Sequence, residues 1–204
     1  MQRWAHTVGS EDELALLFDA PAAASLHKET SFVHPLYRAL IEASPFFALA
    51  TSGPGGLDVS PRGDAPGFVV VEDANTLLLP ERRGNNRIDS LRNIVADPRV
   101  ALLFLIPGRG ETLRVNGRAT IVADPALLDR FLVDGKRPKC VLAVEVETVF
   151  FQCARAVIRS TLWDAPAPPL LPSAGQILAA LSGEAIDGAA YDRDLPERQR
   201  KTLY

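Results

Sequence analysis

The chain has 204 residues, of which 47% are hydrophobic and 23% are charged, and its formal net charge is -3. These proportions exclude an intrinsically disordered chain and provide enough apolar residues for a sizeable core. The slightly negative charge argues against a nucleic-acid backbone or an anionic membrane as the partner.

The two cysteines, Cys140 and Cys153, have neither the number nor the spacing of a disulfide framework or a zinc site. We expect both to be buried and to act as small apolar residues. The first residues are interrupted by charges and do not match a signal peptide, and no run of eighteen apolar residues occurs. The expected location is therefore the cytoplasm.

The N-terminal part predicts two helices. Ser10 is followed three residues later by Glu13, which is the pattern of a capping box, and then by apolar residues as far as Phe18. A His-Pro pair at residues 34–35 begins a second helical pattern that ends before Pro45. We expect residues 1–45 to form a helical appendage.

From Phe46 onward the hydrophobic pattern becomes that of short antiparallel strands separated by Gly, Pro and Asp turns. A helical pattern from Ile88 to Val95, closed by Asp97-Pro98, and another from Pro125 to Leu132 interrupt the strands. The expected strands cover residues 46–52, 57–60, 68–71, 76–79, 100–106, 112–122 and 141–146. So many short strands favour a closed β-barrel, because closure removes exposed edges.

After Trp163 the sequence is rich in proline as far as Pro172, which predicts an extended linker. Ser173 and Gln176 repeat the capping-box pattern, so a helix is expected in the tail. The mixed charges of residues 192–201 indicate a solvated helix or a contact with a partner chain. The predicted division is therefore a barrel domain at 46–165 and a linker with a helical tail at 166–204.

The segment from Leu79 to Arg87 lies between a predicted strand and a predicted helix. It brings arginine and asparagine side chains to a helix N-terminus, where unpaired N–H groups and the helix dipole favour an anion. This pattern predicts a phosphate site. A solvated basic loop is the alternative.

The segment from Asp58 to Asp64 is expected to end a strand in a turn, where backbone donors lie beside Ser60 and Arg62. Such a turn could form hydrogen bonds with the edge of a planar heteroaromatic ligand, and an ordinary β-turn is the alternative.

Histidine-based chemistry is not expected, because all three histidines precede the predicted barrel. No metal site and no catalytic residue is assigned from the sequence. The three positions are His6, His27 and His34.

Together with residues 110–118 and 150–163, the segments at 58–64 and 79–87 resemble the pyridoxamine 5′-phosphate oxidase-like FMN-binding split-barrel flavoproteins. The likeness covers roughly residues 32–165 and is greatest to a bacterial FMN-dependent branch with Gly-Asn-Asn-Arg and Thr-Leu-Arg-Val-Asn-Gly stretches. The resemblance implies a mainly β fold with peripheral helices, built as a six-stranded antiparallel split β-barrel. It also implies a homodimer that holds FMN at the subunit interface.

The resemblance further implies which residues bind FMN. Those along the flavin edge and the ribityl chain would be Ser60, Pro61 and Arg62, and those lining the ring Leu79 and Pro80. Those binding the phosphate would be Arg82, Asn85, Asn86 and Arg87. The strand that reaches the cofactor would supply Leu113, Arg114 and Asn116, and the C-terminal stretch Arg159 and Trp163.

Two motifs of the vitamin B6 oxidases are missing from this chain. Those enzymes have an Arg-x-His pair near the C-terminus, where this chain has Arg159-Ser160-Thr161, and a Ser-Arg-Lys run at the phosphate, where it has the Gly-Asn-Asn-Arg stretch of residues 84–87. True pyridoxamine phosphate oxidase activity is therefore not expected.

The function implied by the resemblance is that of an FMN-dependent oxidoreductase, which transfers a hydride or electrons between a small organic substrate and flavin N5. The alternatives are a non-catalytic dimer that stores, carries or senses FMN, and a cofactor-free interaction module on the same barrel. Reduction of the bound flavin faster than that of free FMN would distinguish the first two. A colourless protein that cannot be reconstituted with FMN would favour the third.

Overall fold

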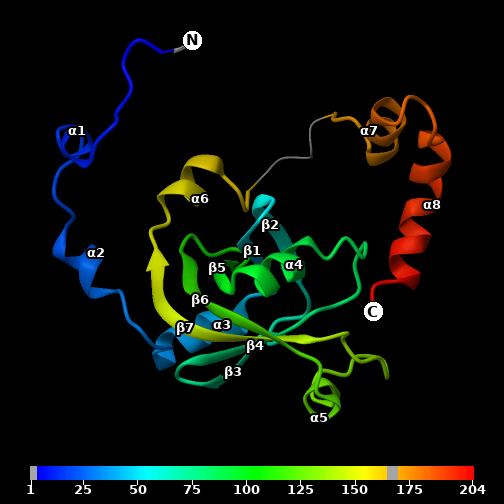
Figure 1. The fold of residues 1–204 in the computed structure, drawn as a ribbon, viewed down its shortest axis with the longest axis horizontal. Coiled ribbons are helices and arrows are strands. Elements are labelled where there is room, and N and C mark those ends of the chain that lie inside the picture. The colour runs from blue at the N-terminus through cyan, green and yellow to red at the C-terminus, as the bar shows by residue number, and fades with distance from the viewer. Residues whose placement is uncertain (1–3, 165–169) are drawn as a thin grey trace.

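The computed structural model describes residues 4–164 and 170–204, and its centre is one antiparallel β-sheet (Figure 1). The strand order is β2-β1-β5-β6-β7-β4-β3. The strands are β1 (Phe46–Gly53), β2 (Gly56–Gly63), β3 (Val70–Asp73), β4 (Thr76–Pro80), β5 (Arg99–Leu105), β6 (Thr112–Val122) and β7 (Val141–Gln152). The predicted mainly β fold with peripheral helices is confirmed.

The predicted six-stranded barrel is not confirmed, because seven strands form one sheet with β2 and β3 at its edges. Side chains connect edge strand β2 to the end of β4. Arg62 Nε lies 3.0 Å from Glu81 Oε2, and Arg82 Nε lies 2.7 Å from Asp64 Oδ2. The sheet is therefore curled, and these two ion pairs join its edge strand β2 to the end of β4.

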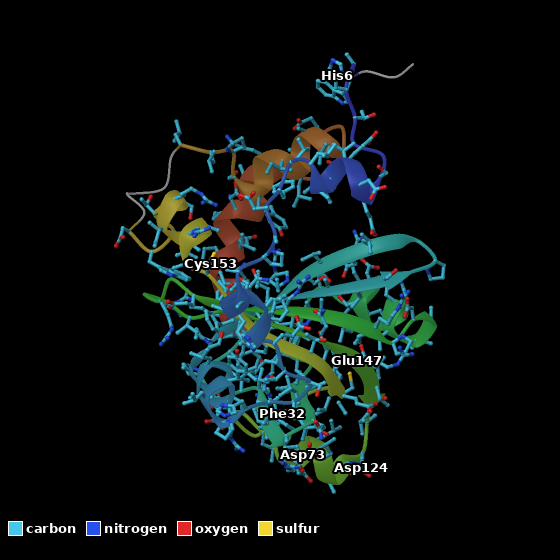
Figure 2. The ribbon with its side chains drawn as sticks, turned by 90° about the vertical axis from the view of Figure 1, so that its left-hand side faces the viewer. His6, Phe32, Asp73, Asp124, Glu147 and Cys153 are labelled. Carbon is cyan, nitrogen blue, oxygen red and sulfur yellow. The ribbon has the colours of Figure 1, made fainter. Side chains whose placement is uncertain are left out.

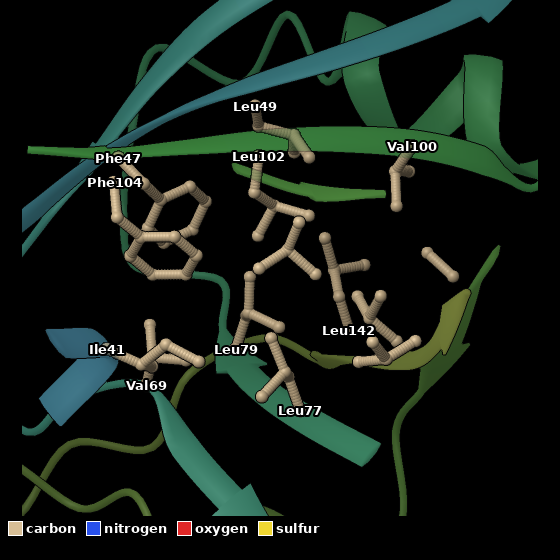
Figure 3. Packing of buried hydrophobic residues seen from close by; sticks show 14 of the residues in the cluster. Ile41, Phe47, Leu49, Val69, Leu77, Leu79, Val100, Leu102, Phe104 and Leu142 are labelled. Carbon is tan, nitrogen blue, oxygen red and sulfur yellow. The ribbon is translucent and has the colours of Figure 1, made fainter. Parts of the chain in front are cut away.

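Inward-facing side chains of the curled sheet form one apolar core (Figure 3). The ring of Phe47 on β1 lies 5.1 Å from that of Phe104 on β5 and is stacked on that of Phe68 at 5.7 Å. Helix α3 (Pro35–Ala43) buries Ile41 against this cluster. His34 caps α3, because its Nδ1 accepts a hydrogen bond from the Leu36 N–H.

Helix α4 (Asp89–Ala96) packs on β1 and β2 and buries Ile94. Its Asn93 side chain donates a 3.1 Å hydrogen bond to Thr51 on β1. The helix begins directly after Ile88, the first residue of the predicted helical pattern, and Asn86 and Ile88 have left-handed φ angles of 60° and 53°. Helix α5 (Pro125–Asp129) is capped by Asp124.

Strand β2 is longer than predicted, because Pro61 and Arg62 follow Ser60 in pairing with β1 instead of forming a turn. Proline is tolerated here because β2 is an edge strand, so one side of it needs no backbone N–H donors. The segment predicted to end β2 in a turn is therefore a strand as far as Gly63.

The terminal helices lie outside the sheet (Figure 1). On the N-terminal side, α1 (Glu11–Ala15) and α2 (Ala23–His27) bury no residue. On the C-terminal side are α6 (Arg155–Ser160), α7 (Ala174–Leu181) and α8 (Gly188–Lys201). The helices α2 and α6 were not predicted. Residues 165–169 of the predicted linker lie outside the described residues, and the predicted domain boundaries stay a prediction.

Helices α7 and α8 pack against each other. Asp192 on α8 accepts a 2.7 Å hydrogen bond from the Gly175 N–H and a second hydrogen bond from the Ser173 hydroxyl. In the parts of the chain that the structure describes, no helix combines the length and the apolar composition that a bilayer crossing requires.

The two cysteines differ in environment. Cys140 is buried as predicted, and burial raises the pKa of its thiol to about 11, with the Glu81 carboxylate adding to the shift. The prediction for Cys153 was wrong, because this residue is exposed. It follows the end of β7, where the chain leaves the sheet for α6 (Figure 2).

A β-bulge disturbs the pairing of β6 with β7. Asn116 pairs with Thr148, but Gly117 pairs with Val146, so Glu147 has no partner on β6 (Figure 2). At this point the two backbones approach closely, and a Cβ on Gly117 would lie 2.1 Å from the Glu145 carbonyl oxygen. The bulge therefore requires glycine at this buried position.

We expect Gly117→Ala to lower the free energy of unfolding by about 1–3 kcal/mol, because the methyl group must push two paired strands apart. Gly55→Ala is the matched control, since nothing lies within 4 Å of a Cβ built there. Denaturant unfolding of both variants measures the difference. Equal stability of the two would contradict the account of the bulge.

Candidate functional site

The predicted phosphate segment borders a basic pocket of about 510 Å³. Five of its lining side chains are lysine or arginine, and they come from the loop after β4 and from the loop between α5 and β7. The lining residues are Arg82, Arg83, Asn86, Lys136, Arg137, Pro138, Lys139 and Tyr204. This concentration of positive charge favours an anionic ligand although the whole chain is negative.

A smaller hollow of about 160 Å³ adjoins the basic pocket, since Arg82 and Arg83 line both. The remaining lining residues come from β2, from the end of β4 and from the residues beside them. They are Pro61, Arg62, Gly63, Phe68, Pro80, Glu81 and Gly84. The structure therefore brings the two predicted segments, 58–64 and 79–87, to one place.

Arg82 is fixed at the centre of this place. Its Nε donates to Asp64 and its Nη1 donates to the Phe131 carbonyl oxygen, both at 2.7 Å. Only 16% of the Arg82 side chain and 4% of the Asp64 side chain are exposed. The guanidinium is therefore held in one orientation, as a binding group requires.

The Asp64 carboxylate also accepts 2.8 Å and 2.7 Å hydrogen bonds from the Ala65 N–H and from the Tyr204 hydroxyl. Burial opposes its ionisation, but the hydrogen bonds from Tyr204, Ala65 and Arg82 outweigh burial and lower the pKa of Asp64. Asp64 therefore stays charged at neutral pH and keeps Arg82 in place.

Ser60 lies on the inner face of β2 and contacts α4 instead of the basic pocket. Its hydroxyl donates a 3.0 Å hydrogen bond to Asp58, and the buried Ser90 hydroxyl donates to Asp58 and to Ser60 at 2.8 and 3.2 Å. These bonds fasten the edge strand to the start of α4, which supports the loop between β4 and α4.

The other residues of the predicted phosphate set are divided. Asn86 lines the basic pocket. The Asn85 side chain accepts a 3.0 Å hydrogen bond from the Arg87 N–H, and Arg87 Nε lies 2.8 Å from the Asp89 carboxylate. These two residues therefore stabilise the loop locally. No side chain caps the N-terminus of α4 beside them.

Arg114 and Asn116 line a separate hollow of about 450 Å³ on the outer face of the sheet, together with residues of β1, β2 and β5. The Asn116 Oδ1 is buried and has no hydrogen-bond partner among the described residues. An acceptor in this state costs free energy unless water, a ligand or another chain supplies a donor.

The remaining predicted residues lie elsewhere. The side chains of Leu79 and Leu113 are buried in the core, so only their backbone atoms could reach a ligand. Arg159 is exposed on α6. Trp163 donates a 2.6 Å hydrogen bond to the Arg109 carbonyl oxygen. Neither lines the two hollows beside Arg82.

The sequence analysis missed the cations between α5 and β7, which are Lys136, Arg137 and Lys139. The Lys-Arg-Pro-Lys run was visible as a local charge cluster, but its distance from residue 82 along the chain concealed the shared pocket. Among the described residues, no group of three His, Cys, Asp or Glu side chains could hold a metal ion.

Comparison with known proteins gives a family match over residues 33–153, to the model described as pyridoxamine 5′-phosphate oxidase. No curated protein matches significantly.

Among solved structures, HupZ of Group A Streptococcus is 22% identical, with a TM-score of 0.46 over 57% of this chain and 90% of that one. General Stress Protein 26 of Bacillus anthracis is 18% identical, with a TM-score of 0.41 over 55% of this chain and 88% of that one. A FAD-binding protein of Mesorhizobium loti is 16% identical, with a TM-score of 0.40 over 60% of this chain and 95% of that one.

We expect Asp64→Asn to lower the free energy of unfolding at neutral pH by about 1–3 kcal/mol, because a nearly buried guanidinium loses its charged partner. Since the pKa of Asp64 is lowered on folding, its contribution is complete above the ordinary aspartate value of 3.8 and is lost as the pH falls through the lower value of the folded state.

Unfolding experiments between neutral pH and pH values below 3.8 test this expectation. The stability difference between the wild-type chain and Asp64→Asn should shrink in the acid range. A difference that is constant with pH would contradict a role of the ionised carboxylate.

Proposed function

The chain belongs to the pyridoxamine 5′-phosphate oxidase family, and from this premise we propose that it is an FMN-dependent oxidoreductase that acts on a small organic substrate. The main supporting observation is the basic pocket beside the hollow lined by Pro61, Arg62 and Pro80. Two free thiols and the negative net charge are compatible with the cytoplasm, where we propose that it acts.

The residues around the basic pocket fit a phosphate group. A phosphate dianion would receive charge-assisted hydrogen bonds from the arginines and lysines that line the pocket. The Asn86 amide would donate a further hydrogen bond, without a charge. Two carboxylates contact cations of this pocket, and each is paired, Asp64 with Arg82 and Asp129 with Arg137. We therefore assign the phosphate end of FMN to this pocket.

The hollow next to the pocket fits the start of the ribityl chain, because it offers the Arg62 side chain and backbone groups at the ends of β2 and β4. Glu81, 3.0 Å from Arg62, holds that guanidinium in a fixed position. When bound, FMN would supply two-electron redox chemistry, while the protein would provide binding, orientation and positive charge. Arg62 and Arg114 are the cations that we assign to the flavin ring system.

A homodimer would bring Arg114 and Asn116 to such a site. The outer face of β2 exposes Leu57 and Val59, which are 88% and 67% accessible. Through the strand register this apolar face continues over Ala50 and Ala101 to Asn116, whose side-chain oxygen has no partner among the described residues. We propose that a second copy covers this face and that FMN lies at the seam.

The alternative is a dimer that binds FMN without turnover, as a store, a carrier or a sensor. Anaerobic reduction by NADH, NADPH or a deazaflavin distinguishes the two. An enzyme should accept electrons faster than free FMN does under the same conditions, and a carrier should not.

We expect the purified or FMN-reconstituted protein to absorb between about 350 and 500 nm as a flavoprotein does. Replacing Arg83 and Asn86 together by Ala should raise the Kd for FMN at least about tenfold, because charge-assisted bonds to the phosphate are lost. Fluorescence titration with FMN measures this change. Arg82 is left intact, since its removal would leave Asp64 unpaired.

Arg92→Ala is the matched control, because Arg92 is exposed on α4 near the same loop and does not line either hollow. Its Kd should equal that of the wild-type chain. If the double variant also binds FMN as tightly as the wild-type chain, the phosphate assignment is wrong.

We expect the wild-type chain to sediment as a dimer and Val59→Asp to weaken the dimer at least about tenfold, because a charge without a partner would be buried at the interface. Binding of FMN should weaken in parallel. Leu36→Asp, at an exposed position on α3, should leave both the dimer and the affinity for FMN unchanged. Analytical ultracentrifugation measures both variants, and a dimer of Val59→Asp with unchanged affinity would place the interface elsewhere.

A further inference from the structure

Tyr204 connects the C-terminal tail to the basic pocket. Its hydroxyl donates a 2.7 Å hydrogen bond to Asp64, and its ring centroid lies 5.6 Å from the Arg82 guanidinium carbon. Its backbone oxygen accepts a 3.2 Å hydrogen bond from the Lys136 ammonium group. The red end of the ribbon therefore lies beside the loop that follows β4 (Figure 1).

These contacts use groups that an anion in the pocket would need. The Lys136 ammonium donates to the Tyr204 backbone oxygen, and the Arg82 guanidinium lies over the Tyr204 ring. Tyr204 itself lines the pocket. Tyr204 is therefore part of the pocket wall and engages two cations, Lys136 and Arg82, that a bound phosphate would also contact.

The tail meets the pocket through Tyr204. The last turn of α8 carries three cations, of which Lys201 is paired with Glu197. The contacts of Tyr204 with Asp64, Arg82 and Lys136 hold the end of the tail at the pocket.

We propose that Tyr204 is a displaceable plug of the basic pocket, and that a phosphate-bearing ligand and the docked tail exclude each other. A phosphate dianion carries two negative charges and offers Lys136 and Arg82 several charge-assisted hydrogen bonds at once, whereas Tyr204 offers one backbone oxygen and an aromatic ring. Binding of the ligand therefore releases Tyr204 and the adjoining end of α8, and docking of the tail lowers the affinity for the ligand by the same factor.

The identity of the ligand as FMN rests on the proposed function, but the plug itself requires only a phosphate. The experiment therefore uses two probes, pyrophosphate and FMN, on the full chain. Calorimetric titration gives the affinities of the wild-type chain, Tyr204→Ala and Tyr204→Phe. Tyr191→Ala is the matched control, because Tyr191 lies on α8 and contacts Arg198 instead of the pocket. Hydrogen exchange of residues 188–204 with and without each probe reports release of the tail.

We expect Tyr204→Ala to bind pyrophosphate about threefold to tenfold more tightly than the wild-type chain, the range that a cation–π contact and one or two hydrogen bonds account for. The affinity of Tyr204→Phe, which loses only the hydrogen bond to Asp64, should lie between those of Tyr204→Ala and the wild-type chain. Tyr191→Ala should bind pyrophosphate with the wild-type affinity. In the wild-type chain, pyrophosphate should speed up hydrogen exchange in the tail.

The outcomes separate the plug from the flavin assignment. Release of the tail by pyrophosphate without any binding of FMN would support the plug and refute the flavin proposal. Binding of FMN with unchanged exchange in the tail and unchanged affinity of Tyr204→Ala would support the flavin proposal and refute the plug. Absence of an effect of pyrophosphate on both affinity and exchange would also overturn the plug.

Discussion

The arrangement of the candidate site depends on the ion pair between Arg82 and Asp64. It joins the segment after β4 to the residue that follows β2, and these two segments lie far apart in the strand order. The nearly complete burial of both side chains strengthens the pair and makes it costly to break. The same contact therefore holds the curled sheet together and gives the basic pocket a cation of fixed orientation.

Strand β2 serves two purposes because its two faces differ. The inner face carries Asp58, Ser60 and Arg62, which contact α4 and the residue after β4. The outer face carries Leu57 and Val59 and is left exposed. Since successive side chains of a strand point to opposite sides, one short segment can support a polar site and an apolar surface together.

Local patterns in the sequence located all seven strands and the position of the loop at residues 79–87, because alternation and turn residues act over short distances. They did not indicate the left-handed backbone at Ile88, the N-cap of α4, since apolar spacing carries no signal for it. They also missed Lys136 and Tyr204, whose roles arise from tertiary contacts with Arg82 and Asp64. Exposed Cys153 was misjudged because burial there depends on where β7 ends.

The order of the strands also governs how the chain reaches this fold. Strand β1 pairs with β2 through a tight turn, but its other neighbour is β5, so residues 46–51 must find residues 100–105. Strand β4 likewise pairs with β7, which comes much later in the chain. Closing the loops between β1 and β5 and between β4 and β7 costs entropy before the strand contacts form. We therefore expect slow folding, during which the apolar outer face of edge strand β2 is open to intermolecular association while the later strands are added.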